Sequence, residues 1–155
     1  MDRDEEPTAK VLFRVASDDG SVDVETLWAF DLGEGKYKLD NSPFYAYSVS
    51  WQDIVYAPFD KDEECPTFAS VVSKSGNRTI RMKFESPIEP GNESDQVLQG
   101  LISSGCSYEG AKSMNVAINI PLEIDLMTIR DFLVEWSAIW EHADPTYETL
   151  YPDQT

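Results

Sequence analysis

The stretch NVAINIPLEIDLMTIRDFLVEW, residues 115–136, decides the fold class because the spacing of its apolar residues changes from that of a strand to that of a helix. Val116, Ile118 and Ile120 alternate with other residues, which is typical of a β-strand. Asp125 is a suitable helix N-cap, and the apolar residues after it recur at helical spacing. That apolar stripe, which we expect to pack on a sheet, consists of Leu126, Ile129, Leu133, Trp136 and Trp140. A strand followed by an amphipathic helix predicts an α+β protein.

The helix that begins at Asp125 is predicted to continue to the region before Pro145, which ends it. Asp131 and Glu135 are expected on its water-facing side. The only histidine, His142, then falls near the helix C-terminus, where a cation stabilises the helix by about 0.3–1 kcal/mol. We interpret His142 as a capping residue in preference to a catalytic one.

An earlier amphipathic helix is predicted between residues 92 and 105. Asn92 or Ser94 can cap it, and Gly105 ends it. Its apolar positions are Val97, Leu98, Leu101 and Ile102. With the flanking strands, this pattern predicts a ferredoxin-like half over residues 67–155, in which two helices pack on an antiparallel sheet.

The first half, residues 1–66, is predicted to be a small twisted β-barrel-like unit, either a separate domain or tightly packed on the second half. Residues 9–16 run into a turn signal, and residues 22–30 after it alternate between apolar and acidic positions, so the two segments predict a hairpin. Further strands are expected at residues 36–40, 42–52, 53–57, 67–73 and 78–84. The segment KSGN between the last two has hairpin length.

Three aromatic residues of the predicted strand at 42–52 share one parity: Tyr45, Tyr47 and Trp51. They could form a platform on which nucleic-acid bases stack, or they could fill a core. A stacking platform needs a cationic groove, and no basic residue lies between Lys38 and Lys61. We therefore expect these rings to pack in the core.

The charge balance disfavours two classes of partner. Twelve basic and twenty-nine acidic residues give a net charge of −17, which repels nucleic acid and anionic membranes. No stretch approaches the roughly 20 apolar residues of a membrane span, and the acidic start is unlike a signal peptide. We expect a cytoplasmic protein without direct contact to nucleic acid or membrane.

No catalytic, cofactor or metal signature is found in the sequence. Cys65 and Cys106 have no CxxC spacing and no neighbouring ligand for zinc, so buried or idle thiols are the simpler interpretation. No nucleophile can be paired with His142 by a known motif. Carboxylate chemistry stays open, because paired acids can come from distant segments.

The acidic residues concentrate toward the C-terminus. Residues 85–155 carry 13 acids and 2 bases, a net charge of −11, whereas residues 1–84 carry 16 acids and 10 bases, a net charge of −6. Such surfaces are either solvated faces or attract a basic partner by complementary potential. The candidate partner-binding residues are Asp60, Asp62, Glu63, Glu64, Asp131, Glu135, Glu141 and Asp144.

Positive charge gathers in the stretch KSGNRTIRMKF, residues 74–84. If it is a strand, Arg81 and Lys83 lie on one face and Arg78 on the other. These cations could form an anion-binding edge, or they could pair with acids of the same chain and protect a strand edge. We favour the second interpretation.

Four segments together carry a family resemblance: ETLWAF, GKYKLDNSPFYAYSVSWQDIV, SKSGNRTIRM and INIPLEIDLMTIRDFLVEW. They resemble an uncharacterised bacterial family, a domain of unknown function, over roughly residues 10–148. The shared features are a tryptophan-containing hairpin, an N-x-P-F segment followed by D-x-V, an S-G-x-x-T-x-R strand and a proline before the last helix. The resemblance implies a bacterial origin and a common fold, but it assigns no catalytic residue.

These observations favour a non-enzymatic, acidic protein-binding module. The leading hypothesis is an immunity-type inhibitor that neutralises a basic toxin or covers a basic enzyme cleft. One alternative is a small carboxylate-dependent hydrolase or ligand-binding protein that uses Arg78 and Arg81 where the halves meet. Another is a DNA mimic, which would need acids spaced along an elongated surface.

Overall fold

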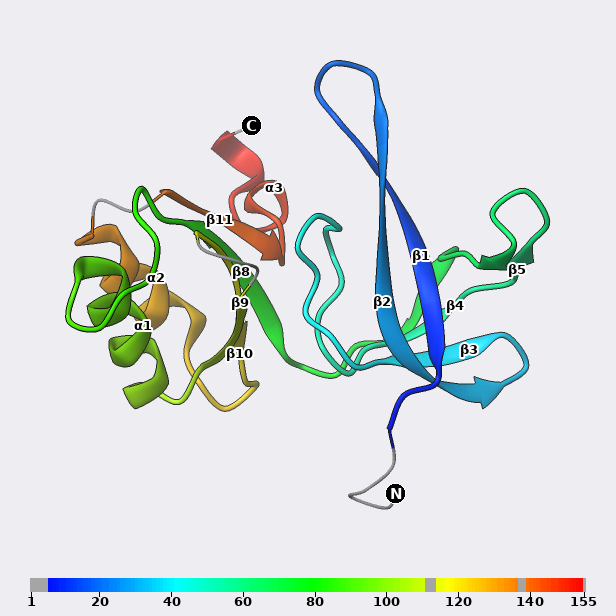
Figure 1. The fold of residues 1–155 in the computed structure, drawn as a ribbon, viewed down its shortest axis with the longest axis horizontal. Helices are drawn as coiled ribbons and strands as arrows, with labels where there is room; N and C mark the ends of the chain where they lie inside the picture. The colour runs from blue at the N-terminus through cyan, green and yellow to red at the C-terminus, as the bar shows by residue number, and fades with distance from the viewer. Residues whose placement is uncertain (1–5, 111–113, 137–138, 155) are drawn as a thin grey trace.

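The computed structural model describes residues 6–110, 114–136 and 139–154 and has an α+β architecture with two larger open antiparallel sheets and a small two-stranded sheet (Figure 1). The first sheet has the order β1 (Ala9–Ala16), β2 (Val22–Gly33), β3 (Lys36–Leu39), β4 (Ile54–Tyr56) and β7 (Ser70–Ser73). The second has the order β11 (Ile139–Asp144), β8 (Arg78–Lys83), β10 (Asn115–Ile120) and β9 (Ser107–Gly110). The small sheet consists of β5 (Phe59–Asp60) and β6 (Cys65–Pro66). The remaining elements are α1 (Glu93–Ser103), α2 (Leu126–Val134), α3 (Tyr147–Leu150) and the 3₁₀ helix η1 (Pro152–Gln154).

The first sheet contains the predicted hairpin, because β1 pairs with β2 from Ala9 opposite Ala29 to Ala16 opposite Val22. One face of the sheet is buried in an apolar cluster that includes Val11, Phe13, Leu27, Leu39, Val49 and Val55. The predicted barrel-like closure is wrong, because β1 and β7 are the two ends of an open sheet. Where β1 meets the segment after β6, the described residues form one bridge, from Leu12 to Thr67. Pro66 has no backbone N–H with which to extend that ladder.

The second sheet is covered on one face by α1 and α2. Its strands bury Ile80, Met82, Val116, Ile118 and Ile120 against Val97, Leu98 and Leu101 of α1 and Leu126, Ile129 and Leu133 of α2. Both predicted helix starts are confirmed, since the side chain of Asn92 accepts from the Asp95 backbone N–H and that of Asp125 from the Thr128 backbone N–H.

We call the part of the chain that forms the first sheet the first lobe, and the part that forms the second sheet with α1 and α2 the second lobe. The other face of the second sheet is polar and meets the first lobe. Thr79, Arg81 and Asn119 are buried there although they alternate with apolar residues of the helix face. Residues 41–53, between β3 and β4, pack on this face, and the Ser50 and Thr79 hydroxyls lie 2.7 Å apart. The two lobes therefore meet through hydrogen bonds and ion pairs as well as through apolar contacts.

The predicted hairpin across KSGN is wrong. β7 pairs with β4 in the first sheet and β8 with β10 and β11 in the second, so residues 74–77 carry the chain from one sheet to the other. The division of the chain after residue 66 stays a prediction.

The predicted long helix is also wrong in its second part. α2 ends at Val134, residues 137–138 lie outside the described residues, and β11 begins at Ile139. His142 is therefore a buried strand residue opposite Ile80 and caps no helix.

The aromatic segment at 42–52 is an irregular connection without strand pairing. Val49 is fully buried, but the side chains of Tyr45 and Tyr47 are 60% and 46% exposed. The prediction that these two tyrosines fill the core is wrong. The cause lies in the backbone, because Ser48 and Gln52 have positive φ angles of 67° and 71°, which break the alternation of a strand.

Candidate functional site

Three adjoining cavities lie along β11, the outer strand of the second sheet, and we call them together the β11 groove. Their volumes are about 830, 450 and 310 Å³, and Glu141 lines all three. Trp140 lines the two largest, and Tyr47 lines the first and third. These volumes are of the size typical of ligand sites in proteins.

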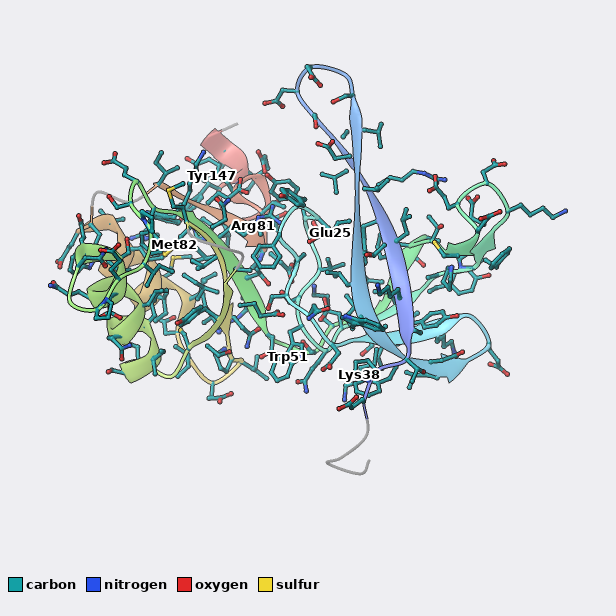
Figure 2. All side chains as sticks on the ribbon, viewed as in Figure 1. Glu25, Lys38, Trp51, Arg81, Met82 and Tyr147 are labelled. Atoms are coloured by element: carbon teal, nitrogen blue, oxygen red, sulfur yellow. The ribbon has the colours of Figure 1, made fainter. Side chains whose placement is uncertain are left out.

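The centre of the groove is a contact between the lobes. Arg81 of β8 donates from Nε to Glu141 Oε1 at 3.0 Å and from a terminal nitrogen to the Ala46 carbonyl at 2.7 Å. Its guanidinium lies 4.4 Å from the ring centroid of Tyr47, whose hydroxyl donates to Glu141 Oε2 at 2.9 Å. Arg81 is buried between the lobes (Figure 2), so these contacts hold Tyr47 in one orientation at the groove wall.

Glu25 of β2 holds the irregular segment that supplies Tyr45 and Tyr47. The Glu25 carboxylate is buried and accepts from three consecutive backbone N–H groups, those of Phe44, Tyr45 and Ala46. Burial followed by the Glu141 hydrogen bond raises the pKa of Tyr47, so its phenol stays protonated and donates at neutral pH.

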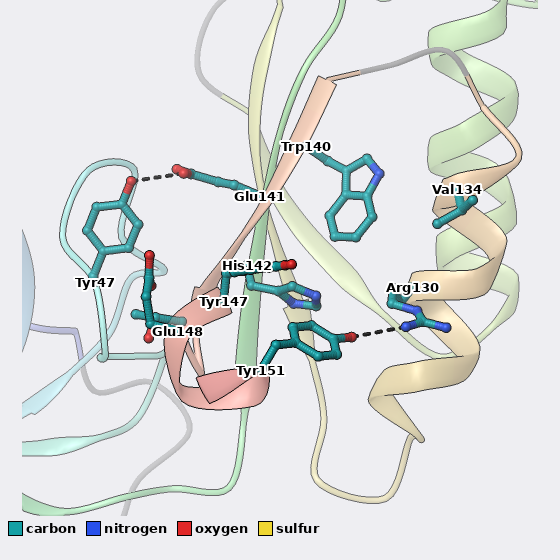
Figure 3. A pocket seen from close by; sticks show the side chains of 10 residues that line it. Tyr47, Arg130, Val134, Trp140, Glu141, His142, Tyr147, Glu148 and Tyr151 are labelled. Carbon is teal, nitrogen blue, oxygen red and sulfur yellow. Dashed lines mark hydrogen bonds between the residues drawn. The ribbon is translucent and has the colours of Figure 1, made fainter. Parts of the chain in front are cut away.

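His142 lies in the wall of the 830 Å³ cavity (Figure 3). Its side chain packs edge-on against Trp140, with ring centroids 5.1 Å apart, and close to Tyr151. The residue is 6% exposed, and neither ring nitrogen has a hydrogen-bond partner among the described residues. Burial, and then the nearby Arg130 cation, lowers the pKa of His142, so the ring is neutral at physiological pH.

The charge of the groove is nearly balanced, but its cations are mostly paired. Arg81 pairs with Glu141, and Arg130 pairs with Asp131 at 2.6 Å. Of the lining residues, Lys83 is the cation without an ion pair in the described chain, whereas three acids have none: Asp18, Asp23 and Glu148. Among the described lining residues, the groove therefore has more acids than cations without an ion pair.

The edge of β11 is open to a further strand over part of its length. At its C-terminal end the Ala143 carbonyl accepts from the Ser48 backbone N–H, and Ala143 also bridges to Thr146. From Ile139 to His142 the described residues place no strand beyond β11. Ile139 is 65% exposed at the open end.

The structure disperses the eight predicted partner-binding acids. Asp60, Asp62, Glu63 and Glu64 lie at the β5–β6 turn, where Asp60 and Glu63 bind Arg14 at 3.3 and 2.9 Å. Backbone N–H groups of Glu63 and Asp62, and then Arg14, lower the pKa of Asp60.

The other four of these acids belong to the second lobe. Asp131 and Glu135 are exposed on and after α2, and Asp144 is buried at the lobe junction. Glu141 is the member of the set that lines the β11 groove.

The basic residues of the stretch 74–84 also lie in separate places. Arg78 donates to the carbonyls of Pro121 and Ile124 on the helix side, whereas Arg81 and Lys83 line the 450 Å³ cavity. Lys74 binds Asp53 at 2.5 Å and Asp144 at 2.6 Å. Arg78 and Arg81 therefore do not converge on one site.

Sequence reasoning missed Tyr45, Tyr47, His142 and Tyr151 as groove residues. The density of aromatic residues at 44–51 was the available signal, but the assumed strand placed them in the core. Among the described residues, no helix is long and apolar enough to cross a membrane. No group of three or more His, Cys, Asp or Glu side chains in those residues could hold a metal ion.

Comparison with known proteins gives a family and a fold. The family described as Domain of unknown function (DUF4265) matches residues 25–142. A crystal structure of a hypothetical protein from Neisseria gonorrhoeae is similar, with a TM-score of 0.78 and 14% sequence identity, over 92% of this chain and 99% of that one. No curated protein matches significantly.

Proposed function

Because this chain belongs to the family described as Domain of unknown function (DUF4265), its function must be argued from its own site, and we propose a non-enzymatic module that binds a basic protein. The β11 groove supports this proposal. Its two largest cavities share Trp140 and Glu141 of an edge strand, so a segment lying along that edge could place side chains in both.

The proposed binding mode is addition of an extended partner segment to β11. Unpaired backbone groups of an edge strand give such complexes their affinity, and pockets for alternate side chains give specificity. Exposed Tyr45, Tyr147 and Ile139 offer apolar area, and tyrosine is enriched at the energetic centres of interfaces. The carboxylates of Asp18, Asp23 and Glu148, which form no ion pair in the described chain, favour a segment that carries Lys or Arg.

An immunity-type inhibitor that neutralises a basic toxin or enzyme in the cytoplasm is the specific role we propose. The net charge of −17 supports it, because complementary charge accelerates association with a basic target. In this proposal the dispersed acids attract the partner at long range and the β11 groove makes the contact.

A site-specific cross-linking experiment tests this proposal. A photo-reactive amino acid replaces Ile139 in the groove or, as a control, Val72, which is 48% exposed on β7 of the other sheet. We expect cross-linking in bacterial host cells to capture a basic protein from position 139 but not from position 72. The purified chain should then inhibit that protein, with an affinity that falls as salt rises.

Charge-reversed variants connect the captured partner to the groove. Glu148→Lys should weaken the complex about tenfold, as expected for loss of a charged contact of about 1.4 kcal/mol. Glu89→Lys makes the same change at an exposed position outside the groove and should bind normally. Equal binding by both variants, or an affinity that salt does not change, would contradict the proposal.

We also infer a ferredoxin-like classification for the second lobe. It is supported by the element order β8-α1-β9-β10-α2-β11 and the strand order β11-β8-β10-β9, with α1 and α2 packed in one apolar cluster. Determining whether residues 74–155 fold alone, by dispersion of their NMR spectrum, tests whether this lobe is an independent unit.

A further inference from the structure

A fourth cavity, of about 260 Å³, lies at the β9 end of the second sheet, whereas the β11 groove lies at the opposite edge. Among the described residues, no basic side chain lines it. Its polar lining is Asp40, Ser42, Ser107, Glu109 and Asn119, and its aromatic lining is Trp51 and Tyr108. We call it the Asp40–Glu109 cavity.

The two carboxylates of this cavity have hydrogen bonds but no counter-charge among the described residues. Asp40 Oδ1 accepts from the Trp51 indole N–H at 3.3 Å. Glu109 accepts from the Asn41 side-chain amide at 2.8 Å and from the Ser42 backbone N–H. Neither acid forms an ion pair within the described chain. Within the part of the chain that the structure describes, the cavity therefore carries two negative charges without a neighbouring cation.

Asn119 provides a second, independent observation at the same cavity. This residue is 3% exposed, and its side-chain Oδ1 has no hydrogen-bond partner among the described residues. Its amide nitrogen is occupied, because Nδ2 donates to Asn77 Oδ1 at 3.3 Å. A buried carbonyl without a partner is destabilising, so such atoms in native proteins usually have a partner or an ordered water.

We propose that the Asp40–Glu109 cavity binds a cationic nitrogen group, a guanidinium or a primary ammonium. Both groups are donors without acceptors, which matches two carboxylates and an unpaired amide oxygen. The rings of Trp51 and Tyr108 add attraction for a cation at their faces. The planar guanidinium fits best, because it can stack on an aromatic ring while it donates in the plane.

The cation can come from a small free amine or from a side chain of a protein, and both sources present the same chemistry. The site is separate from the β11 groove, since the two share none of the lining residues that the structure describes. The probes are therefore 1,4-diaminobutane for a free amine and acetyl-Gly-Arg-Gly-amide for an arginine side chain. The peptide with citrulline in place of arginine is the matched neutral control.

Titration of the ¹⁵N-labelled protein, followed by NMR, tests the proposal. We expect the arginine peptide or the diamine to shift the Trp51 indole signal and the amides of residues 40–42, 107–109 and 119. The citrulline peptide should shift none of them. Tighter binding of the peptide assigns the site to a protein partner, and tighter binding of the diamine assigns it to a small amine.

Asp40→Asn removes one charge and keeps an acceptor for the Trp51 indole, so we expect about tenfold weaker binding from loss of a charge-assisted contact. Asp62→Asn, an equal change in the β5–β6 turn, should bind as the native chain does. Equal shifts with the citrulline peptide, shifts elsewhere, or unchanged affinity of folded Asp40→Asn would overturn the proposal. If Asp40→Asn does not fold, the arginine and citrulline comparison on the native chain decides.

Discussion

Lys74 Nζ lies 2.6 Å from Asp144 Oδ2, so an ion pair joins the crossing between the two sheets to the end of β11. The same ammonium binds Asp53, which is fully buried, at 2.5 Å, and the Ser50 hydroxyl donates to Asp144 at 2.6 Å. This cluster fastens three segments of the lobe junction that are distant in the sequence.

Lys74→Met should destabilise the protein by about 3 kcal/mol, because it leaves two buried carboxylates without their cation. Urea unfolding followed by tryptophan fluorescence measures the change. Lys61→Met removes an exposed lysine from the β5–β6 turn and should change stability by less than about 0.5 kcal/mol. Equal stability of the two variants would show that the cluster does not hold the lobes together.

Glu25→Ala should loosen the segment that carries Tyr45 and Tyr47, because three backbone N–H groups lose their acceptor. We expect a loss of about 2 kcal/mol in the free energy of unfolding. Hydrogen exchange at residues 44–46 should become faster, while exchange in α1 changes no more than the lower global stability requires. Unchanged exchange at 44–46 would contradict this role for Glu25.

His142 should make the protein less stable in mild acid. Its pKa in the folded state is lowered by burial and by Arg130, so the unfolded chain takes up a proton more readily. The stability that depends on neutral His142 is fully present above the ordinary histidine pKa of 6.5. It is lost as the pH falls below that value, by at most about 1.4 kcal/mol for each pH unit.

His142→Phe tests this pH effect because it keeps a buried ring without a titrating group. Urea midpoints at pH 7.5, 6.5 and 5.5 should fall less for the variant than for the native chain. Arg130, whose cation faces His142 and lowers its pKa, is present in both proteins. Parallel curves for the two proteins would refute the assignment.

The two thiols should differ in reactivity. Cys106 is 5% exposed, and this burial raises the pKa of its thiol to about 11. Cys65, in β6, is partly exposed. With Ellman's reagent at pH 8, Cys65 should react first, because the thiolate is the attacking form. Cys65→Ser should remove the fast phase, and Cys106→Ser should leave it. A fast phase that persists in Cys65→Ser would contradict the burial of Cys106.

The spacing of apolar residues alone did not distinguish strand from helix in the C-terminal region. Trp136 and Trp140 continue a helical stripe, yet Trp140 lies in β11 opposite Met82. Pairing with β11 gives β8 a second partner strand, and this tertiary contact overrides the local helical pattern. The same limitation explains residues 42–52, where alternation predicted a strand but long-range acceptors such as Glu25 hold an irregular backbone.

The candidate site was predictable only in its ingredients. Glu141 and Arg81 were recognised as candidates, but not as a pair, because β8 and β11 are brought together by pairing across about 60 residues. The Tyr47 hydroxyl and Glu141 are separated by 94 residues in the chain. No pattern within a short window can encode such a contact.

The amino-acid sequence by itself determined the α+β class, the β1–β2 hairpin, the starts of α1 and α2, and the large negative charge. These features depend on interactions between residues a few positions apart, or on composition. Tertiary structure alone decided which strands share a sheet, where α2 ends, and which polar side chains meet at the lobe junction. Those outcomes depend on burial and charge pairing between distant segments, whose free energy is gained only once the whole chain has folded.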